Sequence, residues 1–184
     1  MTAILLAILI VAVAAWGVWV FNRLVRDRNQ VRSAWSDIDV QLTRRHDLVP
    51  QLVEAVKAYA AYERATLEAV TALRTRSERA GALPDKARLE DELQAGIERL
   101  IAVAESYPDL KADANFLKLQ RQLTEVEDHL QYARRFYNGA VRIYNTRIET
   151  FPHMFVARPF GFSPAEFFAV SGEEVRAAPR LGTG

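Results

Sequence analysis

The chain has 184 residues, of which 50% are hydrophobic, and its 24 Lys and Arg residues nearly balance its 23 Asp and Glu residues. Because the net charge is close to zero, no global field would draw nucleic acid or an acidic substrate, and no nucleic-acid partner is predicted. The sequence contains no cysteine, which excludes disulfides, thiol nucleophiles and cysteine-ligated metal or iron–sulfur centres.

The chain begins with an apolar run. Residues 3–21 carry no charged side chain, and a helix of about 28 Å over this run would match a hydrocarbon core of about 30 Å. Only Met1 and Thr2 precede the run, whereas a cleaved signal peptide needs Lys or Arg before a shorter apolar core. The sequence therefore favours a retained transmembrane anchor over residues 1–22. The residues assigned to this anchor are Ala3, Trp16, Trp19 and Phe21.

Positive charge follows the run at once, as Arg23, Arg26 and Arg28. The positive-inside bias then predicts an external N-terminus and a cytoplasmic domain beyond Asn22. The same arginines either serve only as this orientation signal or also bind anionic lipid headgroups, at about 1 kcal/mol per charge.

Beyond the anchor, the sequence predicts a long first helix. From residue 31 to residue 73, apolar residues recur at alternating steps of four and three, a period typical of coiled-coil-like packing. No Gly or Pro stands between Gly17 and Pro50, so the anchor helix is predicted to run directly into this segment. At Pro50 we expect a kink, or else a new helix with Asp47 as its N-cap.

Two further helices are predicted. The second begins near Asp85 and ends before Pro108, and the third begins near Asp113 and ends before Pro152. Short connections and the lack of period-two runs predict an all-α antiparallel bundle of three to four long helices over residues 23–170. Because the second helix is shorter than the other two, parts of their apolar faces need covering by the C-terminal segment, another copy of the chain or a membrane.

The C-terminal segment is rich in phenylalanine. Residues 151–168 hold six of the nine phenylalanines, and interspersed prolines prevent one long helix. We expect this segment to cap a groove of the bundle, with Pro164 opening a short helical turn. The alternative is a hook that binds a partner or dips into a membrane. Residues 171–184 are predicted to form a flexible tail. The residues assigned to interaction are Phe160, Phe162, Phe167 and Phe168.

No pattern of catalytic or metal-ligating residues is found. A di-iron bundle needs Glu three positions before His, but those positions hold Thr43, Val126 and Thr150. Glu125 and His129 lie one turn apart, a spacing more typical of a solvated ion pair. The HExxH, Gly-x-Ser-x-Gly and phosphate-loop motifs are missing. The sequence therefore predicts no enzyme activity, no catalytic or metal-binding residues and no cofactor.

Three polar residues lie on predicted inner faces and are assigned as candidate interaction residues. Arg45 either pairs with a carboxylate and fixes helix register, or packs its aliphatic stem while its charge reaches solvent. Tyr137 and Tyr144, each followed by Asn, share one helix face. Their rings are expected to lie in the core with their hydroxyls at its rim.

Several longer motifs resemble the bacterial LemA family. They are RNQV at 28–31, AWSDIDVQL at 34–42, RRHDLVP at 44–50, VE at 53–54, YPDLKA at 107–112, NF at 115–116, ARR at 133–135, YN at 137–138 and 144–145, and FGF at 160–162. The resemblance implies a short external N-terminus, one span and a bundle related to four-helix up-and-down folds, with no assigned activity. Family members often accompany membrane metalloproteases and membrane-stress proteins, which by association implies a scaffold or adaptor role.

Together these features predict a non-enzymatic scaffold in the lipid bilayer. Anchoring raises the effective concentration of copies, so weak sideways contacts would suffice for homo-oligomers such as a ring, lattice or shell. The alternative is a regulatory or adaptor subunit of a membrane-bound protease or envelope stress system, with residues 160–168 as its docking element.

Overall fold

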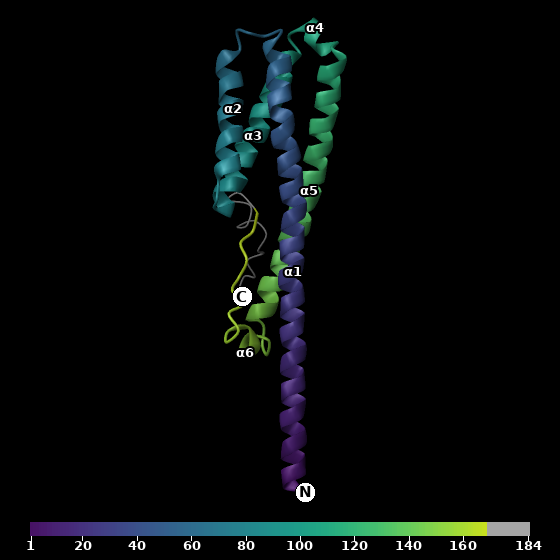
Figure 1. The fold of residues 1–184 in the computed structure, drawn as a ribbon, viewed down its shortest axis with the longest axis vertical. Helices are drawn as coiled ribbons and strands as arrows, with labels where there is room; N and C mark the ends of the chain where they lie inside the picture. Colours follow the sequence, from purple (N-terminus) through teal and green to yellow (C-terminus); the bar gives the residue numbers. More distant parts are fainter. Residues whose placement is uncertain (169–184) are drawn as a thin grey trace, which may run out of the picture. The chain divides into compact units, whose positions relative to one another are not determined.

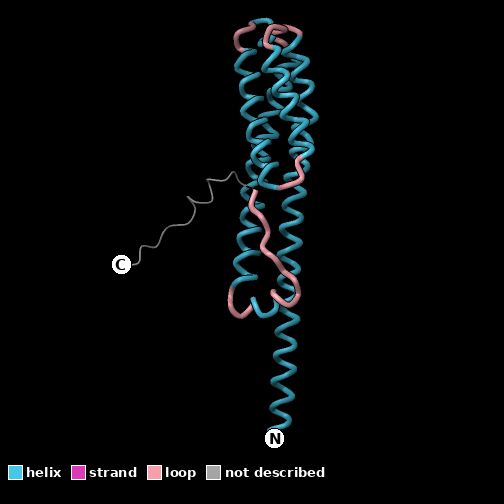
Figure 2. The backbone as a smooth tube through the Cα atoms, turned by 90° about the vertical axis from the view of Figure 1, so that its left-hand side faces the viewer, coloured by secondary structure: helices cyan, strands magenta, loops and turns pink. Residues whose placement is uncertain are grey.

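The computed structural model describes residues 1–168, which form six helices and no strand (Figure 2). The helices are α1 (Thr2–Lys57), α2 (Arg64–Arg79), α3 (Leu83–Ala104), α4 (Pro108–Lys111), α5 (Ala114–Glu149) and α6 (Met154–Ala157). The predicted all-α class is therefore confirmed. The predicted tail, residues 171–184, lies outside the described residues.

The first helix continues through its proline, but it ends earlier than the sequence predicts. Pro50 lies inside α1, and no new helix starts at Asp47. The prediction of helix through residue 73 is wrong, because the chain reverses at residues 58–63 between α1 and α2. Both helices face the same core and keep the same apolar period, so periodicity alone does not reveal the reversal.

Other predicted helix boundaries lie at or near residues that begin, cap or end a helix. Pro84 lies in the first turn of α3, where its missing N–H is not needed. The carboxylate of Asp113 accepts the backbone N–H groups of Asn115 and Phe116, both at 2.9 Å, and so caps the start of α5. The helix α5 ends at Glu149, three residues before Pro152.

The chain divides into two compact units. The helix-pair unit contains Met1–Asp37 and Arg135–Glu166, and the bundle unit contains Ile38–Arg134 with Phe167 and Phe168. Within the bundle unit, segments of α1 and α5 lie side by side with α2 and α3 (Figure 1). This is the four-helix arrangement that short connections between amphipathic helices favour.

The bundle unit encloses an apolar core. A Cβ atom added to Gly96 of α3 would lie 2.9 Å from Cγ2 of Val70 in α2, so these two helices approach closely. All four long helices contribute to the core through residues spaced three or four apart, as one apolar helix face requires. Core residues include Val49, Leu52, Val56, Leu67, Val70, Leu93, Ile97, Leu100, Phe116, Leu123 and Val126.

The helix-pair unit is covered over only part of its length. Val20, Leu24 and Ala34 of α1 are fully buried, as is Val141 of α5. Towards the N-terminus this changes: every large apolar side chain from Ile4 to Trp19 is exposed, by fractions between 37% and 67%. Within this unit no other element lies alongside those turns (Figure 1). Among residues 1–168, α1 is the one helix long and apolar enough to cross a membrane.

The C-terminal segment differs from its predicted form. Residues 162–167 have no regular structure, so within the described chain no helical turn starts at Pro164. The side-chain amide of Asn145 explains this, because it accepts the N–H of Ala165 at 2.8 Å and donates to its carbonyl at 2.9 Å. The carbonyl of Ala165 is one that a helix starting there would need as an acceptor for its own backbone hydrogen bonds. The helical turn that does form is α6, ten residues earlier.

Candidate functional site

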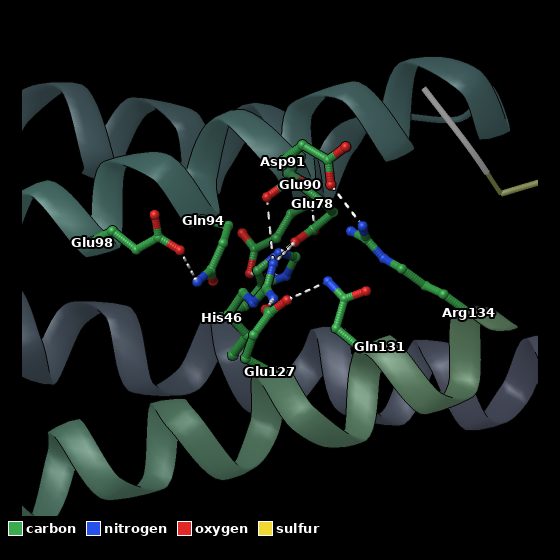
Figure 3. Close-up of polar contacts among 11 residues, drawn as sticks. His46, Glu78, Glu90, Asp91, Gln94, Glu98, Glu127, Gln131 and Arg134 are labelled. Atoms are coloured by element: carbon green, nitrogen blue, oxygen red, sulfur yellow. Dashed lines mark hydrogen bonds and ion pairs between the residues drawn. The ribbon is translucent and has the colours of Figure 1, made fainter. Parts of the chain in front are cut away.

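A charged cluster lies inside the bundle unit (Figure 3). We define it by Arg45 of α1, Ser77 of α2, Glu90 of α3 and Glu127 of α5, so each long helix contributes one side chain. Arg45, Ser77 and Glu90 are only 1%, 0% and 0% exposed. Burial of charged groups is tolerated only when they are paired and hydrogen-bonded.

The cluster meets this condition through Glu90. One of its carboxylate oxygens, Oε2, lies 3.3 Å from Nη1 of Arg45. The other, Oε1, accepts the Ser77 hydroxyl and lies 2.7 Å from Nε2 of His46. The second guanidinium nitrogen of Arg45 pairs with the carboxylate of Glu127. Each buried charge therefore has an opposite charge or a donor against it.

A partly exposed ring of polar contacts surrounds the cluster. Arg134 reaches Asp91 at 2.7 Å, and the amide of Gln131 donates to the Glu127 carboxylate at 2.6 Å (Figure 3). On the other side, Arg74 donates to the His46 carbonyl at 3.2 Å and lies 2.8 Å from Glu78. Of these contacts, the one from Gln131 positions Glu127, which pairs with Arg45.

The cluster shifts two pKa values. Burial by itself would raise the pKa of Glu90, but the hydrogen bonds from His46 and Ser77 and the charges of His46 and Arg45 outweigh it and lower that pKa below its ordinary value. Burial lowers the pKa of Arg45, against the raising effect of Glu127 and Glu90. A guanidinium stays protonated under these conditions, so Arg45 and Glu90 form an ion pair.

The hydrogen bonds of the cluster follow the pattern of a buried network that joins helices, and not the pattern of a catalytic triad. In a nucleophilic triad the serine hydroxyl donates to the histidine, whereas the Ser77 hydroxyl donates to Glu90, which also binds His46. Burial keeps substrate from both groups. Among residues 1–168, no group of three or more His, Cys, Asp or Glu side chains is placed to hold a metal ion. The exposed pair Glu125 and His129 lies 3.9 Å apart.

Sequence reasoning found only one member of the cluster. Arg45 is paired with carboxylates from two other helices, so its charge does not reach solvent. Glu90 was not identified as an inner-face residue. The signal was present: Glu90 precedes Leu93 by three residues and Ile97 by seven, which puts a negative charge on the same face.

The two tyrosines lie on the inner face of α5. The hydroxyl of Tyr137 donates to the carbonyl of Glu166 at 2.8 Å, and its ring packs edge-on against Trp35 at 5.7 Å. Burial raises the pKa of Tyr137, with the charge of Glu166 adding to it, and burial also raises the pKa of Tyr144. Together with Asn145, Tyr137 fixes residues 165–166 on α5.

The four assigned phenylalanines belong to two different units. In the helix-pair unit, the ring of Phe21 lies 5.1 Å from that of Phe160 and 5.7 Å from that of Phe162, over which Arg28 lies at 4.9 Å. In the bundle unit, Arg134 lies 4.8 Å from the buried ring of Phe168, and Phe167 is half-buried.

The residues assigned to the membrane anchor and the headgroup region lie at the N-terminal half of α1. Ala3, Trp16 and Trp19 are exposed, and Phe21 is half-buried. Of the arginines, Arg26 is exposed, Arg23 lies 3.9 Å from Asp27, and Arg28 is half-buried over Phe162.

Comparison with known proteins identifies the family. A model of the LemA family matches residues 34–182. The magnetosome proteins MamQ 2 and MamQ 1 of Paramagnetospirillum magneticum are 26% identical to this chain over 174 residues, covering 80% of it and 64% of themselves. Protein LemA of Metamycoplasma hominis is 28% identical over 133 residues, covering 71% of this chain and 60% of itself. The chain thus spans less than two thirds of the length of these relatives. Since the family match extends over more than half of it, the chain belongs to the LemA family.

Proposed function

We propose that this chain is a non-enzymatic scaffold that crosses the membrane once and self-associates there. The observation that carries this proposal is the exposed apolar surface of α1 from Ile4 to Trp19, on a helix that continues without a break to Lys57. In water this surface would be unfavourable by about 25 cal/mol for each Å² of apolar area. A bilayer removes this surface from water.

Charge supports an orientation for this span. Arg23, Arg26 and Arg28 follow the apolar run. The domain is then cytoplasmic and the N-terminus external, in a bacterial inner membrane. Protease added to intact cells should leave the domain intact and digest it only after the cells are opened. Digestion in intact cells would reverse the orientation.

An exposed stripe on α5 supports self-association. Phe136 and Ile143 are 44% and 54% exposed, and Gly139 lies between them at spacings of three and four. A Cβ atom on Gly139 would meet nothing within 4 Å, so no contact within the described chain requires a glycine there. Glycine inside a helix is less favourable than alanine by about 1 kcal/mol. Its compensation here is the close approach of a second helix, from another copy of the chain.

The association test uses the full-length chain in detergent and in lipid nanodiscs. The mass of the particles, measured over a range of concentrations, should exceed that of one chain. The Gly139→Leu variant should shift the particles towards single copies with unchanged helicity, because the added side chain meets open space within its own chain. Ala114→Leu adds nearly the same apolar bulk at another exposed position of α5 and serves as the matched control. A solitary wild-type chain at every concentration would contradict self-association.

The alternative is an adaptor for a membrane-bound protease or an envelope stress system. An open groove of about 870 Å³ between α1 and α2 favours it, with Val53, Leu67 and Ala72 among its lining residues. A groove of this kind could take an amphipathic helix of a partner. A chain that stays single alone and assembles only when the protease is added would support this function over self-association.

A further inference from the structure

An aromatic loop stands out at the end of the helix-pair unit. We call residues 151–160, which include α6, the Phe loop. Phe151, Phe155 and Phe160 are 71%, 63% and 63% exposed, although the first two rings pack edge-on at 5.8 Å. Three large exposed rings within ten residues form a patch that water does not favour.

The Phe loop is amphipathic and held in place by its own packing. Val156 and Ala157 of α6 are 8% and 1% exposed, so one side of this turn packs inward while Phe155 points outward. Directly after the loop, Gly161 adopts φ = +69°, a conformation that favours glycine. The exposed rings are therefore presented by a folded element rather than by a disordered tail.

Contacts with α1 fix the level of the loop along the proposed span. The ring of Phe160 lies 5.1 Å from the ring of Phe21, which is the last residue of the apolar run. Two residues further on, Arg23 starts the charged stretch. Since α1 is one continuous helix through this point, the loop lies at the depth where the span leaves the hydrocarbon. Aromatic side chains prefer this depth.

The charges around this level suit lipid headgroups. Arg26 and Arg158 are exposed. Glu149 and Glu166 are exposed acidic residues of the same unit, while Asp27 is paired with Arg147 and with Arg23. The groups nearest in sequence to the end of the span and to the Phe loop are thus mainly basic, as an anionic membrane surface would require.

We infer that the Phe loop inserts Phe151, Phe155 and Phe160 into the headgroup–acyl boundary of the leaflet from which α1 emerges, with Arg26 and Arg158 at the headgroups. The inference rests on the proposed single span, because α1 brings the loop to the bilayer. The loop then acts as a second membrane contact, which restricts the tilt and rotation of the helix pair on the membrane surface.

The test places one tryptophan at a time in the full-length chain. The native residues Trp16, Trp19 and Trp35 are changed to Phe, and Phe155→Trp supplies the reporter. The protein is reconstituted in phosphatidylcholine vesicles whose acyl chains carry bromine, a quencher, either near the headgroup or near the chain end. We expect at least twofold stronger quenching by the shallow bromine than by the deep one. We also expect at least twofold protection from acrylamide compared with the same chain in denaturant.

Two reference reporters make the outcomes distinct. A chain that keeps only Trp19 reports on the span. The exposed position Phe136 of α5, as Phe136→Trp, reports on a part of the helix-pair unit fifteen residues before the Phe loop, where no bromine quenching is expected. A quenched Trp19 with an unquenched, acrylamide-accessible reporter at residue 155 would overturn this inference and leave the anchor standing. An unquenched Trp19 would overturn the proposed anchor itself.

Further measurements test whether a second copy of the chain covers the loop and whether anionic lipid strengthens the contact. Protection from acrylamide without bromine quenching, rising with the ratio of protein to lipid, would mean that a second copy covers the loop, and would overturn the inference. Phe151→Trp provides a second reporter should Phe155→Trp fail to fold. Adding phosphatidylglycerol should strengthen the bromine quenching of the chain that carries Phe155→Trp. The increase should be smaller when the same chain also carries Arg158→Gln.

Discussion

The two units of the chain differ in what they bury and in what they leave exposed. The bundle unit buries Arg45 and Glu90 almost completely, whereas the helix-pair unit leaves the apolar side chains from Ile4 to Trp19 uncovered. Four helices can surround a charge and supply its partners, but two helices cover only one face of each other. The apolar turns from Ile4 to Trp19 are therefore the surface that a bilayer would cover under the proposed function.

The largest expected effect comes from breaking the buried cluster. Glu90→Leu removes the carboxylate that pairs with Arg45, His46 and Ser77, and leaves the buried guanidinium with the carboxylate of Glu127 and the backbone carbonyl of residue 90. The free energy of unfolding should fall by about 3–5 kcal/mol. Urea unfolding of the full-length chain in detergent, followed by circular dichroism, measures it.

The matched control for this variant is on the same helix. Glu98 is exposed, and its carboxylate accepts only the amide of Gln94 among the described contacts, at 2.9 Å. Glu98→Leu should change the free energy of unfolding by less than about 0.5 kcal/mol. Equal effects of the two variants would mean that the cluster does not stabilise the bundle unit.

A smaller effect is expected in the helix-pair unit. Asn145→Ala removes both hydrogen bonds to Ala165 and leaves its backbone groups partly buried without this partner. The local cost should be about 1–3 kcal/mol. Amide hydrogen exchange should then accelerate at residues 160–168 and stay unchanged in α2 and α3.

Thr146→Ala, the neighbouring exposed position of α5, is the control for this loss. It should leave exchange at residues 160–168 as in the wild type. If Asn145→Ala leaves it unchanged as well, the amide does not hold this segment.

The smallest effect is a pH dependence that belongs to the bundle unit. The folded-state pKa of Glu90 lies below its ordinary value of 4.5. Between these two values the unfolded chain binds more protons than the folded chain, so the stabilisation by Glu90 is fully present above 4.5 and is lost as the pH falls. The difference in unfolding free energy between wild type and Glu90→Gln should be constant above about pH 4.5 and shrink below it. A constant difference down to pH 2.5 would contradict the lowered pKa.

Local chemistry explains which parts of the fold the sequence could predict. Asp113, Pro108 and Pro152 set helix boundaries through hydrogen bonds or steric clashes with adjacent residues, and the structure has boundaries near all three. The reversal after Lys57 was missed because no Gly or Pro marks it and the heptad period continues across it. The predicted helical turn at Pro164 was wrong because Asn145, twenty residues away, binds the backbone of Ala165.

The candidate site shows the same difference between features set by adjacent residues and features set by residues distant in the sequence. Arg45 could be identified on an inner face from spacing alone, but the choice between pairing and exposure depended on which carboxylates lay opposite it. Glu90 and Glu127 lie 45 and 82 residues further along the chain. No rule of local spacing connects such positions, and only the packing of four helices brings them within hydrogen-bonding distance.

The sequence by itself determined the all-α class, the family and the apolar run that α1 carries, because these depend on composition, period and contiguous motifs. Only the tertiary structure decided that the charges meet in one buried layer and that Phe160 lies against Phe21. The physical reason is that hydrogen bonds and ring contacts act over a few ångströms in space, while their partners are separated by tens of residues along the chain.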